Sequence, residues 1–189
     1  MRGDSAVQTA AWYIRVMTAL VLGFGPFGAV TDNPSSRLAL ALDGRAVGAG
    51  HALVGRIMPV SYQRSFEVTM VAVAAVRPAF VLGVGVAMTR SASLVERFAR
   101  NYAHGSVPDV DGEMRRDHGT GTLLAECAAA AELAAALGFG VSEDAGEYVC
   151  NAWLFQALRA RLPCAFLHVP EAGADPDQVA SGLGRFLAG

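Results

Sequence analysis

The chain has 189 residues, of which 53% are hydrophobic and 17% are charged, and its formal net charge is −2. These values predict one globular domain with a sizeable core, and they give no electrostatic basis for binding nucleic acid or an anionic membrane. All 15 basic residues are arginine, which excludes a lysine Schiff base and a P-loop lysine. The first 17 residues make neither a convincing signal peptide nor a spanning helix. We expect an N-terminal extension over residues 1–16 and a single α/β domain over residues 17–189.

Strand-like and helix-like segments alternate along the first half of the domain. Thr18–Leu22 is a buried strand candidate, and a glycine-rich turn follows it. Pro34–Leu42 is predicted as a helix, because Asn33 suits the N-cap, Pro34 the first helical position and Asp43-Gly44 the stop. Next come a strand over Leu53–Val60, a helix over Tyr62–Val76 and a strand over Phe80–Val86. The second helix is predicted from apolar residues at helical spacing: Phe66, Met70, Val73 and Ala74.

The second half continues the alternation after one ambiguous segment. Leu94–Tyr102 fits either a strand or a helix, and residues 107–112 ("VPDVDG") form a turn. The remaining predictions are an alanine-rich helix over Thr120–Leu137, a strand over Gly138–Ser142, a helix over Glu147–Leu162, a strand over Ala165–Val169 and a helix over Asp175–Leu187. This order predicts an α/β fold with a mainly parallel sheet. Ligands of such sheets bind at the carboxyl ends of strands, here Gly23–Gly28, Gly83–Arg90 and the residues around His168.

The three cysteines, Cys127, Cys150 and Cys164, are few and widely spaced. They form neither a disulfide framework nor a metal-binding pair, and they indicate a reducing, cytoplasmic compartment. Cys150 in "SEDAGEYVCNAW" lies in the first turn of a predicted helix. The positive end of the helix dipole favours the thiolate there. The alternative for Cys150 is an ordinary small core residue.

Two other side chains are candidates for acid–base chemistry. His168 in "CAFLHVPEAG" ends a buried strand, where an imidazole can act as a base with a fixed tautomer. The alternative is a histidine at the core edge bonded to backbone. Glu96 in "SASLVERFARNY" stands in an otherwise apolar stretch, and its alternative is a surface carboxylate. The three groups can act together only if the fold brings them together.

The turn "GFGPFG" matches the GxGxxG pattern of dinucleotide-binding proteins literally. However, Pro26 and two phenylalanines stand where a pyrophosphate turn needs small residues and free N–H groups, and no acidic residue ends a second strand about 20 residues on. We set that interpretation aside. The sequence has no GxSxG or HExxH motif, and His51, His104 and His118 lack ligand-like spacing. We therefore expect no metal and no cofactor.

Several blocks together resemble the signature segments of the pyroglutamyl peptidase I family, the pyrrolidone-carboxylate peptidases. They are "GFGPFGAVTDNPS", "SASLVERFARN" and "AGEYVCN" followed by "FLHVP", and they occur in the family's order from about Thr18 to Pro170. The resemblance implies a three-layer α/β/α sandwich, commonly a homotetramer in bacteria. It also implies a cysteine exopeptidase that hydrolyses the N-terminal pyroglutamyl (5-oxoproline) residue from peptides.

The resemblance also implies roles for single residues. Cys150 aligns with the nucleophile, His168 with the general base and Glu96 with the acid that orients the histidine. Phe24 and Phe27 match two aromatics that clamp the lactam ring. The same comparison assigns substrate binding to Gly85, Arg90, Tyr148 and Val149.

The sequence departs from the family pattern at a few positions. Gly83 stands where the family usually has histidine, Ser106 replaces an arginine, and Glu143-Asp144 replaces Asn-Ser. These departures leave a second hypothesis, a non-catalytic pyroglutamate- or peptide-binding protein on the same fold. Retention of the catalytic trio argues against it. A third hypothesis, a phosphorylase or nucleosidase of related fold, would need an anion or ribose site, and the sequence offers no basic cluster for one.

Overall fold

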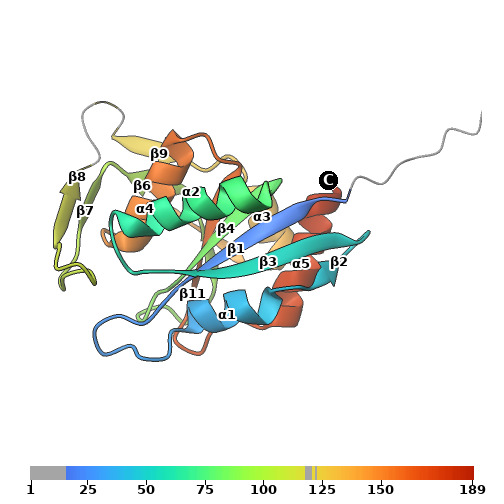
Figure 1. The fold of residues 1–189 in the computed structure, drawn as a ribbon, viewed down its shortest axis with the longest axis horizontal. Coiled ribbons are helices and arrows are strands. Elements are labelled where there is room, and N and C mark those ends of the chain that lie inside the picture. The colour runs from blue at the N-terminus through green and yellow to red at the C-terminus, as the bar shows by residue number, and fades with distance from the viewer. Residues whose placement is uncertain (1–15, 118–120, 122) are drawn as a thin grey trace, which may run out of the picture.

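A computed structural model describes residues 16–117, 121 and 123–189 (Figure 1). Residues 1–15 of the predicted extension lie outside the described residues, as do His118 and Thr120. The strands are β1 (Thr18–Phe24), β2 (Ala46–Val47), β3 (His51–Met58), β4 (Phe80–Val86), β5 (Leu94–Glu96), β6 (Phe98–Arg100), β7 (Tyr102–His104), β8 (Arg115–Asp117), β9 (Leu124–Glu126), β10 (Gly140–Ser142) and β11 (Cys164–Val169). The helices are α1 (Pro34–Leu42), α2 (Arg64–Val76), α3 (Ala130–Leu137), α4 (Val149–Arg159) and α5 (Pro176–Ala188). None of these helices is long and apolar enough to cross a membrane.

Seven of the described strands form one central sheet in the order β10-β5-β11-β4-β1-β3-β2. The pairs β1–β3, β1–β4, β4–β11 and β5–β10 are parallel, and β5–β11 and β2–β3 are antiparallel. The mainly parallel sheet is therefore confirmed, with one internal antiparallel pair. Because β1, β4 and β11 run side by side in the same direction, their carboxyl ends lie at one edge of the sheet.

Helices cover both faces of the sheet, which confirms the predicted α/β/α sandwich. One buried cluster joins alternate side chains of β1 and β4 to α1, α3 and α5. The other joins the opposite face of the same strands to α4 and to partly buried residues of α2. The central strands β1, β4 and β11 are buried on both sides, as their continuous apolar sequences require.

The first helix confirms its local signals in detail. Asn33 is the N-cap, its Oδ1 accepts from the backbone N–H of Ser35 at 3.0 Å, and Pro34 is at the first helical position. The helix ends at Leu42, immediately before Asp43. Capping groups act within a few residues, so they can be read from sequence without knowledge of the fold.

The segment between β4 and α3 differs from the sequence prediction. The helix predicted over Thr120–Leu137 covers only Ala130–Leu137, because Leu124–Glu126 pairs antiparallel with Phe98–Arg100. The ambiguous Leu94–Tyr102 is extended and contributes to three strands. Alanine has a high helix propensity, but pairing with a distant strand outweighs it here.

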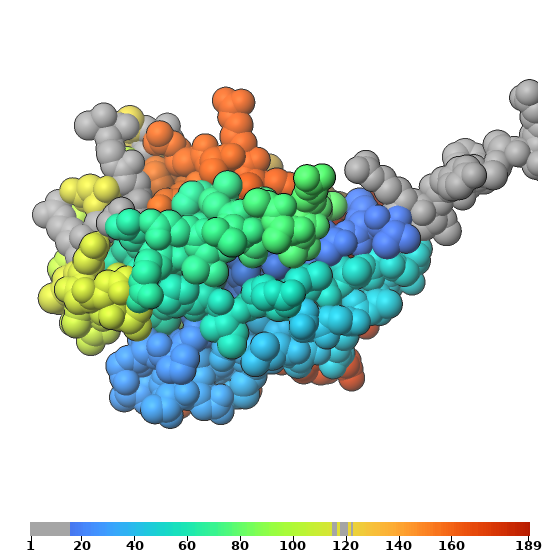
Figure 2. Space-filling model, viewed as in Figure 1, coloured from blue at the N-terminus to red at the C-terminus, as the bar shows by residue number. Residues whose placement is uncertain are grey.

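Helix α2 is present, but its apolar residues do not all face the core. Its buried residues are Ser65 and Thr69, and Thr69 Oγ1 accepts a 2.7 Å hydrogen bond from the indole of Trp153. Of the four residues that predicted it, Phe66 and Val73 are partly buried, whereas Met70 and Ala74 are exposed. The helix lies on the surface seen in Figure 2, where its exposed apolar side chains are Val68, Met70 and Val71.

Candidate active site

Cys150 is the second residue of α4, at the carboxyl edge of the sheet. Tyr148 precedes the helix in an extended conformation and provides no side-chain cap, so the first-turn N–H groups of α4 remain available. A Cβ built on Gly85 would lie 2.7 Å from Cys150 Sγ. Gly85 pairs with His168 in the β4–β11 register. The Cys150 thiol therefore lies over β4 at Gly85. The residue paired with Gly85 on the neighbouring strand β11 is His168, which carries the imidazole.

His168 belongs to a chain of polar contacts that also includes Glu96 and Arg90. Its Nδ1 lies 2.7 Å from Glu96 Oε1, and Glu96 is fully buried. Arg90 donates to the same carboxylate oxygen and also to Ser142 Oγ at 3.1 Å and the carbonyl of Asp144 at 2.8 Å. Because a carboxylate paired with a guanidinium only accepts, His168 Nδ1 carries the proton. Nε2 is then left with the lone pair that a general base needs.

The environment of Cys150 differs from the expectation of a thiolate at the helix start. Its own backbone N–H and Arg90 lower the pKa of the thiol, as expected at this position. Burial and the negative charge of Glu96 outweigh them and raise the pKa to about 12. Among the described residues, the thiol makes no hydrogen bond to the imidazole. We therefore expect the resting thiol to be protonated and to lose its proton during nucleophilic attack.

The pH dependence of alkylation tests this state of the thiol. The thiolate is the reactive form, and raising the pKa above the working pH reduces its fraction. Iodoacetamide should therefore label Cys150 at a rate that rises about tenfold per pH unit between pH 6 and 9. Peptide mass spectrometry measures the rate at each cysteine. Cys127 and Cys164 should react more slowly, because both are buried and burial raises the pKa of each thiol. A constant Cys150 rate from pH 5 to 8 would instead show a resting thiolate.

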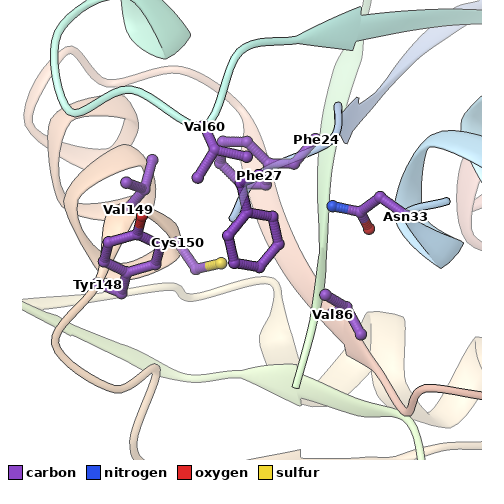
Figure 3. A pocket seen from close by; sticks show the side chains of 8 residues that line it. All are labelled: Phe24, Phe27, Asn33, Val60, Val86, Tyr148, Val149 and Cys150. Atoms are coloured by element: carbon purple, nitrogen blue, oxygen red, sulfur yellow. The ribbon is translucent and has the colours of Figure 1, made fainter. Parts of the chain in front are cut away.

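A small aromatic pocket opens beside the thiol and contains about 260 Å³ of free space, counted together with its open mouth. In Figure 3 the Cys150 sulfur points into the space between Tyr148 and Phe27. The Asn33 amide and Val86 lie on the far side of the Phe27 ring, away from Tyr148. Its lining is Phe24, Phe27, Asn33, Val60, Val86, Tyr148, Val149 and Cys150. The walls are thus apolar and aromatic, which suits a small, flat, uncharged ligand.

The aromatic turn after β1 is held tightly against the start of α1. A Cβ at Gly23 would lie 2.1 Å from the carbonyl oxygen of Ser35, so only glycine permits this approach. Ser35 Oγ accepts from the backbone N–H of Phe24 at 3.0 Å, and Asn33 Nδ2 donates to the carbonyl of Gly25 at 2.9 Å. The turn is therefore positioned by hydrogen bonds, and its phenylalanines are left to form the pocket wall.

The opposite wall is anchored by the turn over residues 105–114. A Cβ at Gly105 would lie 2.4 Å from the ring of Tyr148, whose hydroxyl donates to the carbonyl of Pro108 at 3.0 Å. Burial, Asp109 and Cys150 raise the pKa of the Tyr148 phenol to about 12, which keeps it a donor. The backbone N–H of Val110 donates to the carbonyl of Val60 at 3.0 Å. The predicted turn thus ties two pocket-lining residues together.

Glu143 and Asp144, two of the residues that depart from the family pattern, form ion pairs beside the catalytic candidates. Glu143 pairs with Arg97 at 3.3 Å, and Asp144 pairs with Arg100 at 3.1 Å. Asp144 Oδ1 also accepts from the backbone N–H of Gly146 at 3.0 Å, four residues before the cysteine. Both acidic residues therefore link the loop before α4 to the neighbouring strands.

Most predicted site residues meet at this edge, with two differences. Phe24, Phe27, Tyr148 and Val149 line the pocket with Cys150. Gly85 lies beneath the sulfur instead of in the wall, and Arg90 contacts Glu96 instead of lining the pocket.

Sequence reasoning missed three pocket-lining residues. Asn33 was identified only as a helix cap, whereas Val60 and Val86 were only parts of apolar runs. The places of Val60 and Val86 at the ends of predicted strands were the one signal that could have identified these two residues.

Comparisons with known proteins agree with this architecture. The pyroglutamyl peptidase family model matches residues 17–181. The chain is 30% identical to a pyrrolidone-carboxylate peptidase of Pyrococcus furiosus (89% of this chain, 86% of the relative) and 31% identical to one of Thermococcus litoralis (90% and 81%). A solved pyrrolidone carboxyl peptidase from Thermococcus litoralis shares the fold with a TM-score of 0.80, covering 92% of both chains at 24% identity. With its family model matched over nearly the whole domain, the chain belongs to the pyroglutamyl peptidase family.

Proposed function

We propose that this protein is a cysteine exopeptidase that removes an N-terminal pyroglutamyl residue from peptides by acyl transfer to Cys150. The observation that carries the proposal is the position of Cys150. Its sulfur points into the aromatic pocket and lies over Gly85, next in register to the His168–Glu96–Arg90 chain. The proposed binding pocket and the proposed reacting groups thus meet at the carboxyl ends of the strands.

The proposed reaction follows from the groups around the sulfur. The Cys150 thiol gives its proton to His168 Nε2 as the sulfur attacks the pyroglutamyl carbonyl carbon. The oxyanion accepts from N–H groups in the first turn of α4, and one such donor contributes roughly 3 kcal/mol to transition-state stabilisation. The C–N bond then breaks, and His168 returns the proton to the leaving amine. Water, deprotonated by His168, hydrolyses the thioester and restores the thiol.

Arg90 acts in this scheme as a positioning residue instead of a substrate ligand. Its guanidinium bridges Glu96 on β5, Ser142 on β10 and the Asp144 carbonyl. Arg90 therefore pairs with the buried Glu96 carboxylate, and Glu96 in turn orients the His168 ring through its contact with Nδ1.

The pocket accounts for selectivity toward the lactam. Pyroglutamate is flat and uncharged, with one ring N–H donor, one ring carbonyl acceptor and no α-amine. The aromatic side chains of the pocket can cover the two faces of the lactam ring. Backbone N–H and C=O groups can form hydrogen bonds with the ring carbonyl and the ring N–H. An N-terminal glutamine would bring a charged amine into an apolar pocket without a partner, at a cost of several kcal/mol.

Release of a fluorescent amine from a pyroglutamyl amide tests the proposed function directly. The alanyl and glutaminyl amides of the same fluorophore are the matched controls. Turnover of the pyroglutamyl amide alone supports the proposal. Saturable binding of pyroglutamate without turnover would support a non-catalytic binding protein instead.

The two phenylalanines of the turn should respond differently to truncation. Phe27 is partly exposed and faces Tyr148 with a ring-centroid distance of 6.1 Å, so Phe27→Ala should mainly raise KM, by about 10-fold for one lost apolar wall. Phe24 is 2% exposed and packs against Phe166 in the core, so Phe24→Ala should lower stability by about 3–5 kcal/mol. Steady-state kinetics and thermal unfolding of both variants measure this. An unchanged KM in folded Phe27→Ala would make that residue structural only.

The proposal extends to compartment and assembly. Three free thiols suit a reducing, cytoplasmic environment. The exposed apolar side chains of α2, together with Ile57 (44% exposed), support burial against further subunits in a homotetramer. Sedimentation equilibrium distinguishes a tetramer from a monomer.

A further inference from the structure

A second cavity, open to solvent and lined by both apolar and charged residues, lies next to the aromatic pocket at the same sheet edge. It encloses about 750 Å³ of free space, including its mouth. The residues that matter here are Asp32, Arg37, Met88 and Glu171. They come from the turn before α1, from α1 itself and from the loops that follow β4 and β11. None of them has a role in the proposed chemistry.

Two chain segments run from the lining of one cavity to the lining of the other. Asn33 lines the aromatic pocket, and the next residue, Pro34, lines the second cavity. Val86 lines the first and Met88 the second. The two cavities are therefore neighbours that share their walls.

Chain connectivity links the second cavity to His168, the residue that serves the leaving amine in the proposed reaction. The leaving amine takes its proton from His168, so it must lie beside that ring while the pyroglutamyl ring fills the aromatic pocket. The chain runs from His168 through Pro170 to Glu171 in three residues. The backbone N–H of Ala87 donates to the carbonyl of Val169 at 2.8 Å, and that of Gly173 donates to the carbonyl of Pro170 at 2.8 Å. These bonds hold the loop that carries Glu171 next to the end of β4.

The charges of this cavity are unbalanced. Arg37 is paired with Asp32 at 2.5 Å and is thereby neutralised. Glu171 is exposed and makes no ion pair within the described parts of the chain. One free carboxylate therefore remains, and it attracts a cation.

We propose, building on the function above, that this cavity binds the first residue of the leaving peptide and that Glu171 makes it prefer a basic side chain. Met88, 48% exposed, offers apolar surface for the methylene stem of such a side chain. The substrate class this implies is peptides with an N-terminal pyroglutamate followed by arginine or lysine. Exposed ion pairs have small energies, so the preference should be a few-fold and should weaken in salt.

Three peptides that differ only in the second residue test this: pyroglutamyl-Arg-Ala, pyroglutamyl-Gln-Ala and pyroglutamyl-Glu-Ala. At low ionic strength, kcat/KM should fall about threefold at each step, or roughly tenfold from arginine to glutamate. Glu171→Gln should reduce the arginine-to-glutamate ratio to within about twofold of one, and Glu171→Lys should reverse it. Glu132→Gln changes an exposed glutamate of α3 that lines neither cavity, and it should keep the wild-type ratio.

The outcomes separate this inference from the proposed function. Cleavage of all three peptides with a ratio near one, or a ratio that persists in both Glu171 variants, overturns the role of Glu171 and leaves the peptidase proposal standing. An enzyme that cleaves none of the three overturns both. A salt-sensitive preference for arginine that Glu171→Gln abolishes supports the inference.

Discussion

Replacing Cys150 with serine should lower kcat/KM for a pyroglutamyl amide by about 1000-fold or more. Serine has nearly the same size, but its hydroxyl is a far weaker acid and a weaker nucleophile than a thiol. The general base would have to remove a proton from a hydroxyl in a site tuned for sulfur. Steady-state release of the fluorescent amine measures the loss, and thermal unfolding checks that the fold is retained.

The other two cysteines provide matched controls for this variant. Cys127 donates to the carbonyl of Cys164 at 3.3 Å, and both lie in the core, away from the pocket. Cys127→Ser and Cys164→Ser should therefore keep most of the activity per folded molecule. Substantial turnover by Cys150→Ser would remove Cys150 as the nucleophile.

Adding one methyl group beneath the nucleophile should also reduce the rate, by a smaller factor than the loss of the thiol. In Gly85→Ala the new Cβ would lie 2.7 Å from Cys150 Sγ and 2.9 Å from Phe166 Cζ. Carbon and sulfur atoms cannot approach so closely, so the sulfur must move by about 1 Å. A displacement of that size in reacting atoms costs about 100-fold in rate, so we expect kcat to fall by that factor. The kinetics of the folded variant measure this.

Gly83→Ala is the matched control, two residues earlier on the same strand. Its Cβ would lie 2.5 Å from Trp153 Cζ3 and 2.7 Å from Phe166 Cδ2, but it would not touch the sulfur. Both alanine variants overpack the core, which destabilises by about 1–3 kcal/mol. Only Gly85→Ala should combine that loss with a large fall in kcat per folded molecule. Equal kcat values for the two variants would refute the claim that Gly85 positions the thiol.

These contacts also explain one departure from the family pattern. Gly83 stands where the family usually has histidine, and the space above it is filled by the rings of Trp153 and Phe166. A side chain at this position would collide with the core. The change therefore fits the local packing, and Gly85, two residues further along the strand, lies beneath the Cys150 sulfur.

The sequence alone determined the order and type of most elements. The buried strands are short apolar runs, and α1 and α5 start with an N-cap residue followed by proline. These signals act over a few residues, so they can be recognised in the sequence without knowledge of the fold. Cys150 and His168 also occupied recognisable positions, at a helix start and at a strand end, whereas Glu96 stood in the ambiguous segment over Leu94–Tyr102.

The segment over residues 94–126 could not be determined in this way. Its short strands pair with partners far along the chain, as Phe98 does with Glu126. Such pairing depends on tertiary context more than on local propensity. The same limitation explains the alanine-rich helix that was predicted ten residues too long at its start.

Only the tertiary structure decided how the site works. His168 and Glu96 are 72 residues apart in sequence and meet because β11 and β5 are neighbours in the sheet. The protonated state of the Cys150 thiol, the clamping of Glu96 by Arg90 and the different burial of Phe24 and Phe27 all depend on what surrounds each group in space. Sequence position identifies the residue type and its local backbone, but burial and neighbouring charge are products of packing. Those two quantities set the pKa of the thiol and determine which contacts position the substrate.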